Sequence, residues 1–418
     1  MTKTKGAINM LDTHTINVIK STVPVLETEG VHITKRFYQT MFEAHPELLN
    51  IFNHANQKQG RQQVALANAV YMAALHIDRL EEILPVVKQI AHKHRSLGIR
   101  PDQYPIVGKY LLQAIQDVLG EAATPEILDA WAKAYGVIAD AFIGIEQEMY
   151  QAAEQQPGGW EGFRAFTVQR KERESAVITS FYLVPQDGGE LASFEPGQYI
   201  SVKVHVPGQP YEQIRQYSLS DGPGQPYYRI SVKREDGDDV RPAGQVSVYL
   251  HEQAQEGDVL YLSAPAGDFQ LQRQHGRPVV LISGGVGLTP MMSMLRSLAA
   301  EQPQAGITFI HAASNSELHA MRRQVEEIAS ECPGLSAYYC YSTPTELDRQ
   351  NAVFHYEGYL QPDWLKEMVP NLNADYYFCG PLPFMQAVNT ALDQLEVPVE
   401  QRHYEFFGPA ASLVASGK

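Results

Sequence analysis

The chain has 418 residues, a net charge of −15 at pH 7 and a pI near 5.4, and 44% of its residues are hydrophobic. This length predicts two or three domains, and the hydrophobic content excludes a disordered chain. The acidic balance, without a run of Lys and Arg, argues against a nucleic-acid partner, and no apolar stretch reaches the roughly eighteen residues that a membrane anchor needs.

The N-terminus and the cysteines indicate the cytoplasm. Residues 1–12 are too polar for a signal peptide, and Met10 is an alternative start. The 3 cysteines, Cys332, Cys340 and Cys379, are odd in number and lack metal-site spacing. This usage is typical of a reducing compartment without a disulfide framework. We therefore expect a cytoplasmic protein.

Residues 10–150 are predicted to form an all-α domain. Apolar residues recur at helical spacing over residues 34–42, 63–74 and 130–150, and few alternating β-branched runs interrupt them. One further helix is predicted over Leu80–Ser96, where His94 continues the apolar face, about 40° from Ile90. His92 lies about 200° from Ile90, on the opposite face. The inward imidazole of His94 could bind a metal, or it could be a core histidine bonded to a carbonyl.

The pattern changes at residues 151–162, which are predicted to be a linker because Pro157 and the glycines after it cannot continue a helix. From Phe163 the apolar residues alternate with period two, and Gly- and Asp-rich turns separate the runs. Short strands at this spacing predict an antiparallel β-barrel over residues 163–272. The expected strands are 163–172, 176–184, 198–206, 213–220, 227–235, 245–252 and 258–265.

Residues 273–418 are predicted to form an α/β domain with a parallel sheet. Buried-type strands begin at residues 278, 307, 337 and 375, and helical periods cover 291–301, 316–332 and 383–395. Strands that alternate with helices in this way are typical of βαβ crossovers. The first strand runs into GGVGLTP, where Gly284, Gly285 and Gly287 precede a helix.

This glycine-rich turn predicts a nucleotide site. Missing side chains let a diphosphate approach the backbone, and the helix N-terminus supplies free N–H groups. Pro290 stands where a dinucleotide fingerprint has its third glycine, and proline suits a first helical turn. The alternative is a tight strand–helix connection without a ligand.

The ordered set RQYS, GGVGLTP and FCGP resembles the ferredoxin–NADP reductase family over residues 160–418. The resemblance implies that the barrel holds FAD, with Arg215 at its diphosphate, and that the last domain binds a nicotinamide nucleotide. The implied FAD contacts are Tyr199, Arg215, Gln216, Tyr217, Ser218, and the backbone of Gly244, Gln245, Val246 and Ser247.

The same resemblance implies a nucleotide site and a C-terminal aromatic segment that places Phe407 over the flavin ring. Taken singly, Tyr217 could be an ordinary strand aromatic and Phe407 an exposed terminal hydrophobe. The implied nucleotide contacts are Gly285, Val286, Gly287, Leu288, Thr289, Pro290, Cys379, Gly380 and Pro381, and the C-terminal segment is Phe406, Phe407, Gly408 and Pro409.

A flavin and nicotinamide module needs an electron acceptor, and the helical domain is the candidate within the chain. The sequence resembles flavohaemoglobins over its whole length, with matches in IFNHANQ, IAHKH, QYPIVG, LDAWAKAYGV, GGWEG, RQYSL, PAGDF, HAA and the C-terminal HYE and FGP. The resemblance makes His94 the proximal ligand of haem iron and implies a pocket of Tyr38, Phe52, Gln62 and Leu66, with Tyr104 and Glu146 holding His94.

Helical spacing supports parts of this assignment. Gln62 and Leu66 are four residues apart and share one helix face, and Glu146 shares the face of Phe142 in the same way. A buried carboxylate needs a partner, and a bond from His94 to Glu146 would give the imidazole anionic character. The alternative for Glu146 is a surface charge near a helix end.

The flavohaemoglobin resemblance implies a monomeric NAD(P)H-dependent nitric oxide dioxygenase with haem b, FAD, and NADH or NADPH, acting on oxygen and nitric oxide. Two alternatives stay open: a reductase without haem whose acceptor is another protein, and a haem-dependent oxygen carrier or sensor. Arg322 and Arg323 could meet the 2′-phosphate of NADPH or be ordinary helix charges. Lys93 and Glu405 resemble residues that flank the haem–flavin gap, where a gate is one hypothesis.

Overall fold

The computed structural model describes residues 11–239, 242–272, 276–302, 304 and 306–408, and for residues 54 and 55 only the backbone. Met10 and Pro409 lie outside this part of the chain. The chain forms two compact units. One holds the described residues up to 156 together with the short segments 160–163 and 203–215, and the other holds the remaining described residues.

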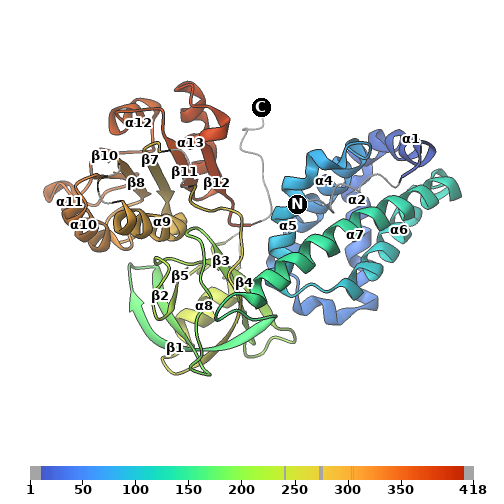
Figure 1. The fold of residues 1–418 in the computed structure, drawn as a ribbon, viewed down its shortest axis with the longest axis horizontal. Coiled ribbons are helices and arrows are strands. Elements are labelled where there is room, and N and C mark those ends of the chain that lie inside the picture. The colour runs from blue at the N-terminus through green and yellow to red at the C-terminus, as the bar shows by residue number, and fades with distance from the viewer. Residues whose placement is uncertain (1–10, 240–241, 273–275, 303, 305, 409–418) are drawn as a thin grey trace. The chain divides into compact units, whose positions relative to one another are not determined.

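Residues 11–155 fold almost entirely into helices (Figure 1). Helix α2 packs on α4 and α6, and α5 packs on α7. One hydrophobic cluster, which includes Ile33, Phe37, Met41 and Trp131, forms the centre of these helices. The helices are α1 Thr13–Ser21, α2 Val23–Ala44, α3 His54–Lys58, α4 Arg61–Leu75, α5 Leu84–Leu97, α6 Tyr104–Leu119 and α7 Pro125–Gln155, with 3₁₀ turns at Pro46–Asn50, Leu80–Ile83, Pro101–Gln103 and Gly120–Ala122.

The helix predicted over residues 80–96 begins later than expected. Its first four residues form a 3₁₀ turn, and α5 starts at Leu84 because Pro85 fits only the first turn of an α-helix. Helix α5 ends at Gly98, whose positive φ of 77° closes the helix as a left-handed cap. Helix α7 continues to Gln155, five residues into the stretch predicted as linker, and Pro157 follows.

Residues 163–263 contain a six-stranded sheet in the order β4-β3-β6-β1-β2-β5, and the β1–β2 and β2–β5 pairs are antiparallel. An antiparallel bridge between Leu219, just after β4, and Ile230 in β5 joins the two edge strands and closes the sheet into a barrel. The strands are β1 Phe163–Arg173, β2 Ile178–Pro185, β3 Tyr199–Val204, β4 Gln213–Ser218, β5 Tyr228–Lys233 and β6 Val259–Ser263.

The strand predicted over residues 245–252 is wrong, because this segment is helix α8, Gln245–Glu252. Its buried residues are Val246, Ser247 and Leu250, which follow helical spacing. Two valines and a tyrosine gave the segment an apparent alternation, and the four-residue repeat between Val246 and Leu250 decided its conformation.

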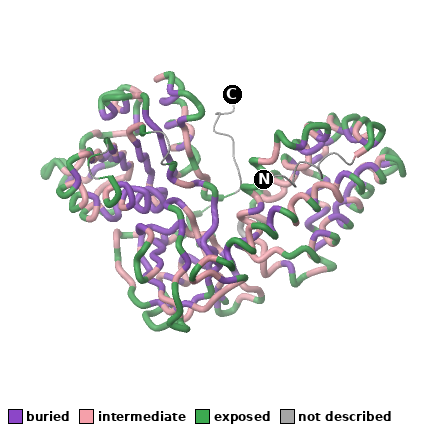
Figure 2. Tube along the Cα trace, viewed as in Figure 1, coloured by how far each residue is buried: buried purple, intermediate pink, exposed green. Residues whose placement is uncertain are grey.

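Residues 279–405 form a parallel sheet in the order β10-β9-β8-β7-β11-β12. Alternate residues of β7 enter two different cores: Leu281 packs with α9 and α10, and Ile282 packs with α12 and α13. Figure 2 shows buried strands in the middle of this sheet, where β7 and β11 are buried along their whole length. The elements are β7 Val279–Gly284, α9 Leu288–Glu301, β8 Ile307–Ala313, α10 Arg322–Glu331, β9 Leu335–Tyr341, α11 Glu346–Gln350, β10 Tyr356–Glu357, α12 Pro362–Met368, β11 Asp375–Cys379, α13 Leu382–Gln394 and β12 Arg402–Glu405, with 3₁₀ turns at Gly285–Gly287 and Val399–Gln401.

Two features of this domain differ from the sequence expectation. The helix predicted over residues 316–332 begins only at Arg322, because Met321 adopts a left-handed conformation with φ of 57°. Strand β12 was not predicted, and it adds a sixth strand beside β11. Within the described ranges, no helix is both long and apolar enough to cross a membrane.

Candidate functional site

His94 lies in the last turn of α5, where it meets two side chains from other helices. Its Nδ1 is 2.8 Å from Glu146 Oε1 and 3.2 Å from the Tyr104 hydroxyl, and Tyr104 donates a bond of 2.6 Å to the same Glu146 oxygen. Tyr104 is fixed in turn by Tyr135, whose hydroxyl donates to the Tyr104 carbonyl at 2.6 Å. The structure therefore brings together the three predicted residues His94, Tyr104 and Glu146.

The surroundings of this triad determine where its protons lie. Glu146 is only 2% exposed, and burial, followed by the hydrogen bond and the charge of Glu146, holds the pKa of Tyr104 far above its ordinary value. Tyr104 therefore keeps its proton at neutral pH. A carboxylate accepts but does not donate, so Nδ1 of His94 carries the ring proton and Nε2 presents a lone pair.

This arrangement fits a haem better than a bare metal ion. No cluster of three or more His, Cys, Asp or Glu side chains suited to a metal ion occurs in the part of the chain that the structure describes. A haem brings four nitrogen ligands of its own and needs one axial histidine. His94, oriented from Nδ1 and with its side chain 31% exposed, meets that need.

The predicted distal residues also lie together. Tyr38 of α2 is 5% exposed, and its ring centroid is 5.8 Å from that of Phe52 and 5.7 Å from that of Phe42. Leu66 of α4 packs against the same hydrophobic cluster. Burial raises the pKa of Tyr38 well above its ordinary value, while the amide of Gln62 opposes that shift, so the hydroxyl stays protonated at neutral pH.

Gln57 is a distal residue that the sequence reasoning missed. Its amide is the second one that acts on Tyr38, after that of Gln62. Gln63 donates to the Gln57 side-chain oxygen at 3.0 Å, so the side-chain nitrogen Nε2 of Gln57 points away from Gln63. That nitrogen is buried and has no hydrogen-bond partner within the described residues. Gln57 is the last residue of the IFNHANQ match, but no helical spacing pointed to an effect on Tyr38.

The predicted flavin residues lie on adjacent barrel strands. Arg215, Gln216, Tyr217 and Ser218 end β4, and Tyr199 begins the neighbouring β3. The Arg215 guanidinium bonds locally, to the Ile214 carbonyl at 2.7 Å and to Gln213 at 3.2 Å. Gly244 is the N-cap of α8 without a side-chain cap, so the first backbone N–H groups of Gln245, Val246 and Ser247 point out of the helix end, as the predicted diphosphate contact requires.

Three predicted motifs, two for the nicotinamide nucleotide and one for the flavin, follow three adjacent parallel strands, β7, β11 and β12. These motifs are the glycine turn, the Cys379–Pro381 segment and the C-terminal aromatic segment. Because the carboxyl ends of parallel strands meet at one sheet edge, the motifs share that edge, where α/β sheets bind their ligands. A Cβ at Gly287 would overlap the Cys379 carbonyl, so two of the motifs touch directly.

The residues of these three motifs fall into a buried group and an exposed group. Leu288, Thr289 and Pro290 are buried in the first turn of α9, and Cys379 is fully buried. Their side chains face the interior, which leaves their backbone as the surface for a ligand. Gly285, Val286, Gly380 and Phe406 are partly exposed, Pro381 and Gly408 are exposed, and Phe407 is 47% exposed.

The two arginines considered for a 2′-phosphate are both paired. Arg322 Nε is 2.7 Å from Glu326 and Arg323 Nε is 3.0 Å from Glu327, each one helical turn further along α10. This is the pattern of ordinary helix charges, one of the two interpretations that the sequence left open.

Comparisons with known proteins match all three parts of the chain. The models for "Globin", "Oxidoreductase FAD-binding domain" and "Oxidoreductase NAD-binding domain" match residues 35–142, 165–271 and 281–390. A flavohemoprotein of Bacillus thuringiensis is 58% identical over 404 residues, 97% of this chain and all of the relative. That of Bacillus subtilis is 56% identical over 407 residues, 97% and 100% of the two chains.

Solved structures agree with these matches. A flavohemoglobin from Malassezia yamatoensis with bound FAD and haem aligns with a TM-score of 0.80 at 28% identity, and the match covers 95% of this chain and 100% of that one. The FAD/NAD-binding domain of a nitric oxide dioxygenase from Vibrio cholerae aligns with a TM-score of 0.53 at 41% identity, covering 59% and 99% of the two chains.

The chain is therefore an oxidoreductase that joins a globin domain to FAD- and NAD-binding domains. It belongs to the flavohemoprotein family. The predicted fold class and the predicted set of cofactors, haem, FAD and a nicotinamide nucleotide, are confirmed.

Proposed function

We propose that the chain is an NAD(P)H-dependent nitric oxide dioxygenase, which joins nitric oxide and oxygen to form nitrate. Each nitric oxide takes up both atoms of one oxygen molecule together with one electron. The observation that carries the proposal is the His94–Glu146–Tyr104 triad in a chain that also holds an FAD and NAD module. The name of the Vibrio cholerae relative of that module supports the same activity.

The residues of the globin domain have separable roles in this reaction. Haem bound at His94 would supply the iron at which the gases react, and FAD would supply its electrons from NAD(P)H. Glu146 holds the Nδ1 proton of His94, which makes the imidazole a stronger donor to iron and favours chemistry at the O–O bond over storage. Tyr38 keeps its proton for a distal ligand, and Gln62 supports it, while Phe52 and Leu66 line the pocket.

The reductase residues serve the two nucleotides. Arg215 and the α8 N-terminus bind the FAD diphosphate, and Tyr199, Gln216, Tyr217 and Ser218 contact the flavin. Residues 285–290 and 379–381 bind the nicotinamide nucleotide through the shared sheet edge, and the segment of Phe406, Phe407 and Gly408 covers the flavin. A gate between Lys93 and Glu405 stays a prediction.

The test is anaerobic reduction of the purified holoprotein with NADH, followed by addition of oxygen and then nitric oxide, watched in the visible range. We expect the flavin absorbance to bleach first, and then the Soret band to shift as the haem is reduced. Nitric oxide should then be consumed, with formation of an equal amount of nitrate. A protein without a Soret band would be a reductase with an external acceptor. If the protein binds haem but consumes no nitric oxide in the presence of NADH, it would be an oxygen carrier or sensor.

His94→Ala tests whether His94 is the residue that holds the haem. This variant should lose haem and keep FAD, measured by the ratio of Soret to flavin absorbance. His92→Ala, on the same helix, is the matched control and should keep both. The reverse result would show that His92 is the ligand and would refute the assignment of the helix face.

A further inference from the structure

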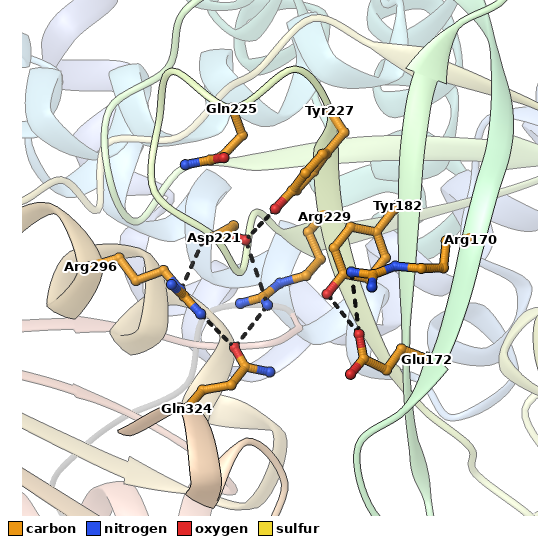
Figure 3. A pocket seen from close by; sticks show the side chains of 9 residues that line it. All are labelled: Arg170, Glu172, Tyr182, Asp221, Gln225, Tyr227, Arg229, Arg296 and Gln324. Atoms are coloured by element: carbon orange, nitrogen blue, oxygen red, sulfur yellow. Dashed lines mark hydrogen bonds and ion pairs between the residues drawn. The ribbon is translucent and has the colours of Figure 1, made fainter. Parts of the chain in front are cut away.

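A polar cluster joins the FAD barrel to the NAD domain, and we call it the lobe junction. Its members are Asp221 and Arg229 from the barrel and Arg296 and Gln324 from helices α9 and α10 (Figure 3). The side chain of Arg229 is 1% exposed and that of Asp221 is 7% exposed. A guanidinium buried to this degree needs fixed partners, because it has lost its water.

Each acceptor of the junction serves both arginines. Asp221 Oδ1 is 3.0 Å from Arg296 Nε, and its Oδ2 is 3.6 Å from Arg229 Nη1. The Gln324 side-chain oxygen accepts from Arg229 Nη1 at 2.9 Å and from Arg296 Nη2 at 2.8 Å. One cation and one acceptor therefore come from each domain. Each arginine contacts the acceptor of the other domain: Arg229 contacts Gln324, and Arg296 contacts Asp221.

Further contacts hold the junction on the barrel side. The Gln324 amide nitrogen lies 3.2 Å from Glu174 Oε2, and the Tyr227 hydroxyl donates to Asp221 at 3.1 Å. Arg229 Nε donates to Ser220 Oγ at 3.1 Å, and its Nη2 donates to the Ser220 carbonyl. Gln324 thus uses both ends of its amide on barrel residues, a role that neither a purely donating nor a purely accepting side chain could fill.

The junction sits between the two predicted binding motifs. Asp221 follows β4, which carries the RQYS flavin motif, by three residues. Arg296 lies on α9, the helix that begins at the glycine-rich nucleotide turn. Gly222 approaches the same helix closely, because a Cβ built on it would be 3.4 Å from Arg296 Cβ. A shift at the junction therefore moves the nucleotide turn relative to the flavin strand.

We propose that Gln324 is a positioning residue, which locks the NAD domain on the barrel so that the nicotinamide meets the flavin at the correct distance for hydride transfer. The inference rests on the proposed use of NAD(P)H and FAD. It needs no contact between Gln324 and either nucleotide. Hydride transfer is sensitive to misplacement, and an error of about 1 Å can cost on the order of a hundredfold in rate.

The test measures flavin reduction in a single anaerobic turnover with NADH, using the full-length holoprotein. Gln324→Leu keeps the size of the side chain and removes both polar ends. We expect the limiting rate of flavin reduction to fall roughly tenfold to a hundredfold. The primary isotope effect with deuterated NADH should rise, because hydride transfer becomes fully rate-limiting, while the flavin content and the carbon monoxide binding rate of the haem stay unchanged.

Two further variants keep the result interpretable. Glu331→Gln, exposed on the same helix, is the matched control and should reduce flavin at the normal rate. Arg296→Lys keeps the charge near Asp221 but loses the fork that reaches Gln324, so it should show a smaller loss, and it carries the test if Gln324→Leu does not fold.

A purely structural role predicts a different pattern. If Gln324→Leu lowers the melting temperature while the limiting rate and the isotope effect stay at the control values, the proposal is wrong. Failure of the proposed function is a separate outcome, because the unmodified protein would then reduce its flavin normally and form no nitrate.

Discussion

At the scale of single residues, Glu146 determines the character of the proximal side. One carboxylate oxygen accepts from both Tyr104 and His94, and the side chain is almost fully buried. The Tyr104 hydroxyl oxygen lies 3.2 Å from His94 Nδ1, whereas the charged Glu146 oxygen lies at 2.8 Å and is the stronger acceptor for the His94 proton. We therefore expect the strength of His94 as a ligand to depend chiefly on Glu146.

Glu146→Gln should weaken that ligand while leaving the fold intact. A glutamine keeps the volume of the side chain but removes the charge that attracts the Nδ1 proton. We expect the iron–histidine stretching frequency in resonance Raman spectra to fall, and nitric oxide consumption to drop about tenfold to a hundredfold, as for other residues that orient a metal ligand. Glu148→Gln, exposed and two residues on, is the control. Equal spectra for the two variants would contradict the assignment.

Gln57 shows what the sequence does not reveal at this scale. The spacing of Gln62 and Leu66 placed both on one helix face, but Gln57 lies on the separate short helix α3. Its approach to Tyr38 depends on the side-chain bond from Gln63. Such a contact depends on how two helices pack together, and no repeat within either helix encodes it.

Gln57→Leu tests this residue. Without its second amide, Tyr38 should donate less firmly to a distal ligand, so oxygen should dissociate about two- to tenfold faster, the range expected for one hydrogen bond. The measurement is stopped-flow displacement of oxygen by carbon monoxide from the reduced holoprotein. Gln59→Leu, exposed on the same segment, should leave the rate unchanged. If both variants behave alike, Gln57 plays no part in the pocket.

At the scale of elements, the sequence predicted what depends on local repeats. The helical stretches, six of the seven barrel strands and the four main strands of the NAD domain follow apolar periodicity, and they are confirmed. Helix α8 was misread because a segment of eight residues carries too few repeats to separate two periods. Strand β12 was missed because RHYE has no apolar run, and its pairing with β11 supplies what its own residues lack.

The glycine turn before α9 gives an element-scale prediction. Gly287→Ala would push its Cβ into the Cys379 carbonyl and separate β7 from β11 at the predicted nucleotide edge. Overpacking of this kind costs about 1–3 kcal/mol, so the dissociation constant for NADH should rise roughly tenfold or more. It is measured by titration of the oxidised holoprotein with NAD analogues. Gly306→Ala, where a Cβ would make an ordinary contact with Pro278, should bind normally.

At the scale of the whole molecule, the chain joins an electron donor and its acceptor covalently. Helix α7 ends at Gln155 and β1 begins at Phe163, so a short connector keeps the two at high effective concentration.

The domains can differ in stability, and the NAD domain contains a buried histidine pair that makes its stability depend on pH. His311 and His319 are buried with ring centroids 4.5 Å apart. The Nδ1 atom of His311 is 2.8 Å from Ser283 Oγ, and that of His319 is 2.8 Å from the Tyr341 hydroxyl.

Burial lowers the pKa of His311 to about 3 and the pKa of His319 well below its ordinary value, to which His311 and Arg322 add. Both rings are therefore neutral in the folded domain and gain protons near pH 6.5 once it unfolds. Below pH 6.5 the unfolded state binds more protons, so stability should fall as the pH is lowered from 6.5 towards 3. Each histidine can contribute up to about 1.4 kcal/mol per pH unit within that window.

Hydrogen–deuterium exchange of β7 and β8 between pH 7 and 5 measures the effect in this domain by itself. His311→Asn should flatten the dependence, whereas His14→Gln, at a side chain that is 72% exposed, should not. An unchanged slope in His311→Asn would mean that His311 is protonated equally in the folded and unfolded states.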